Sequence, residues 1–95
     1  MMKMADQNNM VKGIPSLSKE ARNLKLGKYE HYKGDVVEAI GVSLHSETLE
    51  EFVTYKHVTG RRTGEPYFWA RPIKMFLESI EKNGYKGQRF KYIGK

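Results

Sequence analysis

The chain has 95 residues, of which 39% are hydrophobic and none is cysteine, and it carries a formal net charge of +6. A chain of this length builds one small domain with a modest core. The absence of cysteine excludes disulfides, thiolate metal sites and cysteine nucleophiles. Because there is neither an apolar run of about 20 residues nor the apolar segment of a secretory signal, we expect a cytoplasmic protein without membrane contact.

The positive charge lies at the two ends of the chain. Residues 1–26 hold five Lys/Arg and two Asp/Glu (+3), and residues 79–95 hold five and one (+4), whereas residues 27–78 hold seven and eight (−1). A basic face on the central part is therefore not expected. Any nucleic-acid binding should be weak and carried by the flanks.

The N-terminal residues contain few signals of regular secondary structure. Residues 1–12 are polar and without period, so we expect them to be flexible within a tail that spans residues 1–26. Leu17, Ala21 and Leu24 follow at helical spacing, with Ser18 as an N-cap and Gly27 as a stop. This pattern indicates a short helix at residues 18–25, either formed or only partly formed.

From residue 27 onward the pattern is that of short strands. Alternating or β-branched segments occur at residues 28–32, 36–44, 51–58, 67–71 and 88–93. Gly41, inside the second segment, predicts a bulge or sharp bend. In the fourth segment we expect Phe68 and Ala70 to face the core, and Trp69 and Arg71 to point away from it.

Pro72 ends the fourth strand and predicts a helical turn over residues 72–80, in which Met75, Phe76 and Leu77 close the core. Asn83-Gly84 and Lys86-Gly87 indicate a turn before the last strand. The predicted fold is all-β: a small, strongly bent five-stranded barrel or roll, residues 27–95, with one helical turn before the last strand.

Three segments, GKYEHYKG, GVSLHSETLEEFVTY and FWARPIKMFLE, resemble the domain-of-unknown-function 1653 family of small bacterial proteins. The resemblance covers residues 27–78 and extends more loosely to Ile93. It implies an SH3-like barrel or roll and no reaction. The family positions found here are Tyr29, His31, Tyr32, His45, Ser46, Glu47, Tyr55, Trp69 and Arg71.

The adjacent His45, Ser46 and Glu47 invite comparison with a hydrolase. Neighbouring residues of a strand point to opposite faces, and no nucleophile elbow is present, so the geometry of a catalytic triad is not met. The preferred interpretation is a turn in which Ser46 and Thr48 bond nearby backbone N–H groups. A binding contact is the alternative, and we assign no catalytic residue.

Metal binding would draw on His31, His45, His57 and a carboxylate such as Glu47, but none has the spacing of a zinc site. We therefore predict no metal and no cofactor. The Trp69 and Arg71 pair is the better candidate, because an aromatic ring beside a guanidinium can stack on a ligand. The alternative is that Trp69 covers the barrel end while Arg71 pairs with Glu47 or Glu50.

Together these observations predict a small non-catalytic binding module for a peptide, a protein or a small polar ligand. An RNA- or DNA-binding barrel that uses its basic flanks is the second hypothesis, and a small hydrolase or metal-dependent enzyme is the third. The candidate ligand-binding residues are Tyr29, His31, His45, Glu47, Trp69 and Arg71. We expect His45 and Trp69 to lie within about 12 Å of each other in a shared shallow site.

Overall fold

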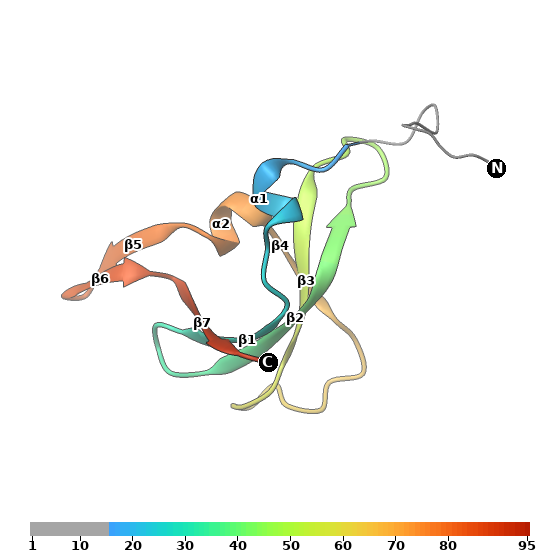
Figure 1. The fold of residues 1–95 in the computed structure, drawn as a ribbon. Coiled ribbons are helices and arrows are strands. Elements are labelled where there is room, and N and C mark those ends of the chain that lie inside the picture. The colour runs from blue at the N-terminus through green and yellow to red at the C-terminus, as the bar shows by residue number, and fades with distance from the viewer. Residues whose placement is uncertain (1–15) are drawn as a thin grey trace.

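The computed structural model describes residues 16–95. Its elements are α1 (Lys19–Arg22), β1 (Gly27–His31), β2 (Val36–Leu44), β3 (Glu51–His57), β4 (Trp69–Pro72), α2 (Ile73–Phe76), β5 (Ser79–Lys82), β6 (Tyr85–Gln88) and β7 (Phe90–Gly94). One antiparallel sheet has the strand order β4-β3-β2-β1-β7, and β5 pairs only with β6. The all-β prediction of a small barrel or roll is confirmed (Figure 1). The prediction that residues 1–12 are flexible lies outside the described residues.

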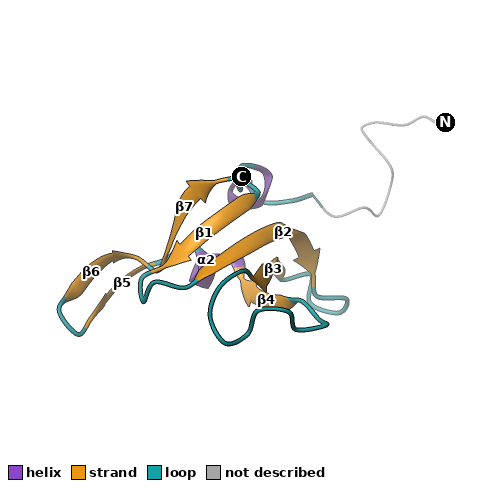
Figure 2. Cartoon of the chain, turned by 90° about the horizontal axis from the view of Figure 1, so that it is seen from below, coloured by secondary structure: helices purple, strands orange, loops and turns teal. Residues whose placement is uncertain are grey.

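The β5–β6 hairpin was not foreseen in the sequence. The predicted helical turn ends at Phe76, and the residues after it form β5 instead of continuing the helix. Asn83 and Gly84, both at positive φ (50° and 83°), make the tight turn that returns the chain into β6. The predicted turn also included Lys86 and Gly87, which instead belong to β6. Figure 2 shows this hairpin projecting away from the main sheet.

A bulge in β2 sets which side chains face the core. Ala39 pairs with Tyr55 and Gly41 pairs with Thr54, so Ile40 is the extra residue. This confirms the irregularity predicted at Gly41. Before the bulge Val37 and Ala39 face the core, and after it the alternation is shifted by one residue, so that Val42, opposite the buried Val53, packs against the core while Ile40 is 41% exposed.

The facing predicted for β4 is wrong. Trp69 pairs with Tyr55 and Arg71 with Val53, and directly opposed residues of two strands share a face. Since Val53 and Tyr55 are buried, Trp69 and Arg71 point to the inner face of the sheet. Phe68, predicted to be in the core, is 63% exposed, and Ala70 is exposed as well.

The core lies on the inner face of the curved sheet and is closed by α2. Phe76 is fully buried and stacks on Phe90 with ring centroids 4.4 Å apart. Its neighbours Met75 and Leu77 are 44% and 41% exposed, so only one of the three residues predicted to close the core does so. Ile73 and Phe76, three positions apart, form the buried side of the four-residue helix, so Met75 points to solvent, and Leu77 lies beyond the last helical residue.

The helix α1 lies within the predicted range 18–25 and is tied to β3. The Ser18 side chain accepts a hydrogen bond from the Ala21 N–H at 3.1 Å, as the predicted N-cap. The Ser18 N–H and hydroxyl both donate to the carboxylate of Glu51, at the start of β3. Ala21 is buried in the core, and Leu17 and Leu24 pack against it.

Candidate functional site

Arg71 occupies an unusual place for a charged residue, because its position on β4 faces the buried core. Its guanidinium carbon lies 5.6 Å from the centroid of the Phe90 ring, in cation–π geometry. Its Nε is buried and has no hydrogen-bond partner among residues 16–95. Within this part of the chain no carboxylate forms a salt bridge with it, so the alternative pairing with Glu47 or Glu50 is not found.

A cavity of about 180 Å³ opens beside Arg71. Five strands and the β1–β2 turn contribute to its lining, which consists of His31, Lys33, Asp35, Val37, Tyr55, His57, Arg71 and Phe90. Strand pairing explains why these residues meet. His31 lies opposite Phe90, and Val37 lies opposite His57, so the ends of neighbouring strands bring their inward side chains to one rim of the sheet.

His31 contributes an imidazole that favours its neutral form. Burial lowers the pKa of His31, and the nearby cations Arg89, Arg71 and Lys33 lower it further, against a smaller opposing effect of Asp35. The His31 Nδ1 accepts a hydrogen bond from the Lys33 backbone N–H at 3.1 Å. In the neutral ring, this leaves the proton on Nε2, which is then a donor.

Trp69 lies next to the cavity without lining it. Its indole ring meets the His57 ring edge-on, with centroids 5.8 Å apart, and His57 is the residue that reaches the cavity. The indole N–H donates to the Glu65 carboxylate at 2.7 Å, and the Arg62 guanidinium lies 4.6 Å from the Trp69 ring centroid. The polar and cationic contacts of Trp69 are thus made by residues of the loop that precedes it.

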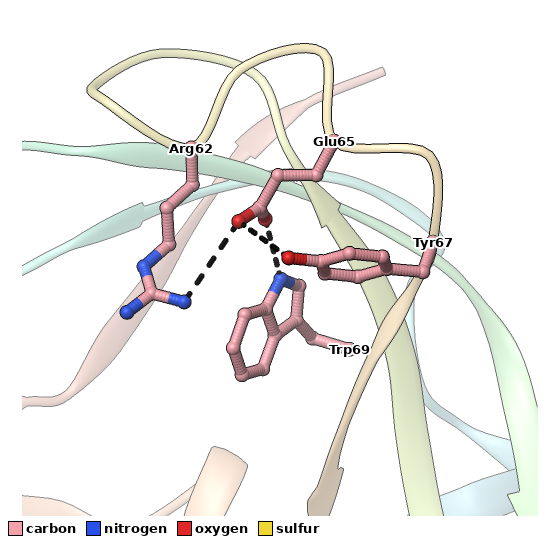
Figure 3. Close-up of polar contacts among 4 residues, drawn as sticks. All are labelled: Arg62, Glu65, Tyr67 and Trp69. Carbon is pink, nitrogen blue, oxygen red and sulfur yellow. Dashed lines mark hydrogen bonds and ion pairs between the residues drawn. The ribbon is translucent and has the colours of Figure 1, made fainter.

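The loop between β3 and β4 converges on the Glu65 carboxylate (Figure 3). Glu65 accepts from Trp69 and, at 3.1 Å, from the Tyr67 hydroxyl, and it forms a 3.9 Å ion pair with Arg62. The hydrogen bond from Trp69, with smaller contributions from Tyr67 and Arg62, holds the pKa of Glu65 below its usual range. These contacts fasten the loop to the first residue of β4.

The segment around His45 is a turn at the other end of β3. The His45 N–H donates to the Glu50 carbonyl, and the His45 Nδ1 accepts from the backbone N–H groups of Glu47 and Thr48, both at 3.2 Å. The Thr48 hydroxyl accepts from the Glu50 N–H, as predicted. Ser46, also predicted to stabilise the turn through its hydroxyl, makes no such bond among the described residues. The imidazole fills that role.

The predicted shared site of His45 and Trp69 is not formed. Trp69 lies opposite Tyr55, whereas His45 follows Leu44, which lies opposite Glu51. Four to five residues of β3 separate the two positions, or roughly 15 Å at about 3.3 Å per residue. His45 and Glu47, both exposed, are therefore remote from the Arg71 cavity.

Tyr29 has a place in the core. It is 5% exposed and packs edge-on against Phe76 at 5.0 Å, and its hydroxyl donates to the Lys25 carbonyl. Burial raises its pKa. Tyr29 also borders a separate groove of about 530 Å³ between α1 and β7. It is therefore not one of the residues around Arg71.

Of the six predicted site residues, His31 and Arg71 line the cavity and Trp69 flanks it. Sequence reasoning missed His57, Lys33 and Asp35. The alternation of Val53, Tyr55 and His57 places all three on one face of β3, which is the signal that could have identified His57. For Lys33 and Asp35, the turn at residues 32–35 was recognised, but its position over the cavity follows from long-range strand pairing.

Within residues 16–95, no three His, Cys, Asp or Glu side chains gather as metal ligands would. None of the helices in this part of the chain has the length and apolar character needed to cross a membrane.

Comparisons with known proteins agree with this fold. A family model described as a protein of unknown function, DUF1653, matches residues 27–92. A comparison with curated protein sequences found no significant match. The crystal structure of a DUF1653 protein from Bordetella bronchiseptica is similar, with 31% sequence identity and a TM-score of 0.68, covering 78% of this chain and 92% of that one. The chain therefore belongs to the DUF1653 family, as its three sequence motifs indicated.

Proposed function

We propose that this domain is a non-catalytic binding module whose small polar ligand enters the cavity beside Arg71. The observation that carries the proposal is the state of Arg71 itself. A buried guanidinium nitrogen without a partner costs about 1–3 kcal/mol, which the cation–π contact of Arg71 with Phe90 offsets only in part. Such costs are typical of positions kept for function.

The larger groove between α1 and β7 is the weaker candidate. Its wall combines exposed side chains of α1 with the rings of Tyr29, Phe90 and Tyr92. Within the described residues, Arg71 Nε is the one buried side-chain polar atom without a hydrogen bond, and it belongs to the smaller cavity. Polar groups that converge on one point give a site its specificity, and the Arg71 cavity combines two cations, two imidazoles and this unpaired donor.

A screen of small polar compounds tests this proposal. Neutral, cationic and anionic compounds would be added to the 15N-labelled full chain, and chemical-shift changes would be followed by NMR. At least one class should shift the His31 and His57 resonances, and Arg71→Met should weaken that binding about tenfold or more. Arg62→Met is the matched control, because Arg62 also lies on an aromatic ring but outside this cavity.

Two results would overturn the proposal. If no compound shifts cavity resonances, or if both arginine variants bind equally well, the cavity is not a ligand site. If mass spectrometry shows that a bound compound is chemically converted, the domain is an enzyme and the non-catalytic assignment fails.

Nucleic-acid binding is a second candidate, favoured by an aromatic pair beside the β5–β6 hairpin. The rings of Tyr32 and Tyr85 stack with centroids 5.3 Å apart, and the Lys33 ammonium lies 5.8 Å from the Tyr32 ring. Exposed bases can stack on such rings next to positive charge. Fluorescence anisotropy with a single-stranded RNA should then show affinity that falls steeply with salt and is lost in Tyr85→Ala; unchanged binding in this variant would exclude it.

A further inference from the structure

We infer that the ligand of the Arg71 cavity is a monocarboxylate with a short apolar stem. This inference rests on the proposed function, because it names the chemical class that the cavity accepts. It is carried by three properties of the lining: its net charge, its volume and the division of its wall into polar and apolar parts.

The charge of the lining calls for a single negative charge. Arg71 and Lys33 are cations and Asp35 is an anion, so the lining is left with one net positive charge when histidine is counted as neutral. Arg89, which lies near His31 but does not line the cavity, already pairs with Glu78 at 2.6 Å. Arg71 has no such partner among the described residues. A ligand with one negative charge would therefore balance the site.

The hydrogen-bond donors around the cavity suit a carboxylate. A guanidinium offers two parallel N–H groups, a geometry that matches the two oxygens of a carboxylate. His31 also lines the cavity, and since its Nδ1 accepts from the Lys33 N–H, the proton of the neutral ring is on Nε2, which can act as a further donor. A phosphate dianion would reverse the net charge of the site and would face the Asp35 carboxylate, so it fits less well.

The volume limits how much of the ligand is enclosed. A cavity of about 180 Å³ has the volume of about six water molecules at roughly 30 Å³ each. This is below the range of about 300–1,000 Å³ that is typical of sites for drug-sized ligands. It accommodates a carboxylate and a few carbon atoms, and the Val37 and Phe90 side chains provide an apolar wall for these carbons.

Two sources of this chemistry can be distinguished by experiment. One is a free short-chain acid, and the other is the C-terminal carboxylate of a peptide. NMR titrations of the full chain would use propionate, propionamide, methylammonium and inorganic phosphate as probes. A tripeptide ending in alanine and its C-terminal amide form a second pair.

Propionate should shift the His31 and His57 resonances and bind at least about tenfold more tightly than propionamide, which has the same shape without the charge. Arg71→Met should weaken propionate binding about tenfold or more, whereas Arg62→Met should leave it within about twofold. Asp35→Asn, at an exposed position, should tighten it about threefold by removing the opposing charge. Tighter binding of the free-acid peptide than of propionate would identify a peptide terminus as the source; the reverse order would identify a small acid.

The inference and the proposed function fail in different ways. If propionamide, methylammonium or phosphate binds in an Arg71-dependent manner while propionate does not, the cavity is a ligand site but the carboxylate inference is refuted. If Asp35→Asn weakens propionate binding, the charge argument is wrong. If none of the probes shifts the cavity resonances of the folded protein, both the inference and the proposed function are refuted.

Discussion

Replacing Arg71 with methionine should separate stability from binding. Methionine keeps an unbranched side chain of similar reach and fills irregular space well, while it removes the unpaired Nε from the core. Removing this unpaired buried donor should raise the free energy of unfolding by about 1–3 kcal/mol. Loss of the cation–π contact with Phe90 costs about 0.5–1 kcal/mol. The balance is a free energy of unfolding that is unchanged or higher by up to about 2.5 kcal/mol, together with loss of ligand binding.

Arg62→Met should change the free energy of unfolding in the opposite direction. Arg62 is exposed, lies over the Trp69 ring and forms an ion pair with Glu65, so its removal should lower the free energy of unfolding by about 0.5–1 kcal/mol. Both variants would be unfolded in urea and followed by far-UV circular dichroism. With a slope near 1 kcal/mol per molar urea, as expected for a small domain, a change of 1 kcal/mol moves the midpoint by about 1 M. If Arg71→Met is destabilised as much as Arg62→Met, Arg71 serves the fold and the case for a binding role is lost.

The core, the loop and the cavity each have a further test. Phe76→Ala should lower the free energy of unfolding by about 3–5 kcal/mol, whereas Phe68→Ala should change it by less than about 0.5 kcal/mol in the same urea assay; similar losses would contradict the observed facing of β4. Because the pKa of Glu65 is lowered in the folded chain, its hydrogen bond with Trp69 is fully formed above pH 4.5 and is lost as the pH falls through the folded-state pKa. Trp69 fluorescence should therefore change in that acidic range in the native chain but not in Glu65→Gln. NMR titration should give a pKa of His31 below 6.5, and propionate should raise this pKa because a bound anion favours the charged imidazole. If the pKa of His31 does not change with propionate, the anion binds elsewhere.

Local sequence signals predicted local structure well. Ser18 caps α1, Gly41 marks the bulge of β2, and Asn83 and Gly84 make a tight turn, because each of these features depends on the backbone preferences of one or two residues. The hairpin around Asn83 was nevertheless missed. Residues 79–82 are mostly polar and continue an apparent helical segment, so they lack the apolar alternation by which strands are recognised.

The facing of β4 and the composition of the cavity depend on long-range pairing. Strand alternation was interpreted with Phe68 and Ala70 facing the core and with Trp69 and Arg71 on the other face, and the register with β3 reverses the two faces. The same register brings His57 beside Trp69 and leaves His45 at the far end of β3. A shift of one residue in register would exchange the two faces, and nothing within a five-residue segment determines that shift.

The segment from Trp69 to Phe76 shows how one short stretch connects the fold to the candidate site. β4 is a four-residue edge strand that pairs only with β3, so its own ladder provides few hydrogen bonds. Trp69, held by Glu65, fastens the beginning of this strand, and Pro72 ends it and starts α2, whose Phe76 is buried against Phe90. Arg71 lies between these two anchors, and its guanidinium carbon is 5.6 Å from the centroid of the Phe90 ring, which also packs against Phe76. These anchors hold the backbone of Arg71 on both sides, and the Phe90 ring restricts its guanidinium, so less entropy is lost when a small ligand binds with few contacts.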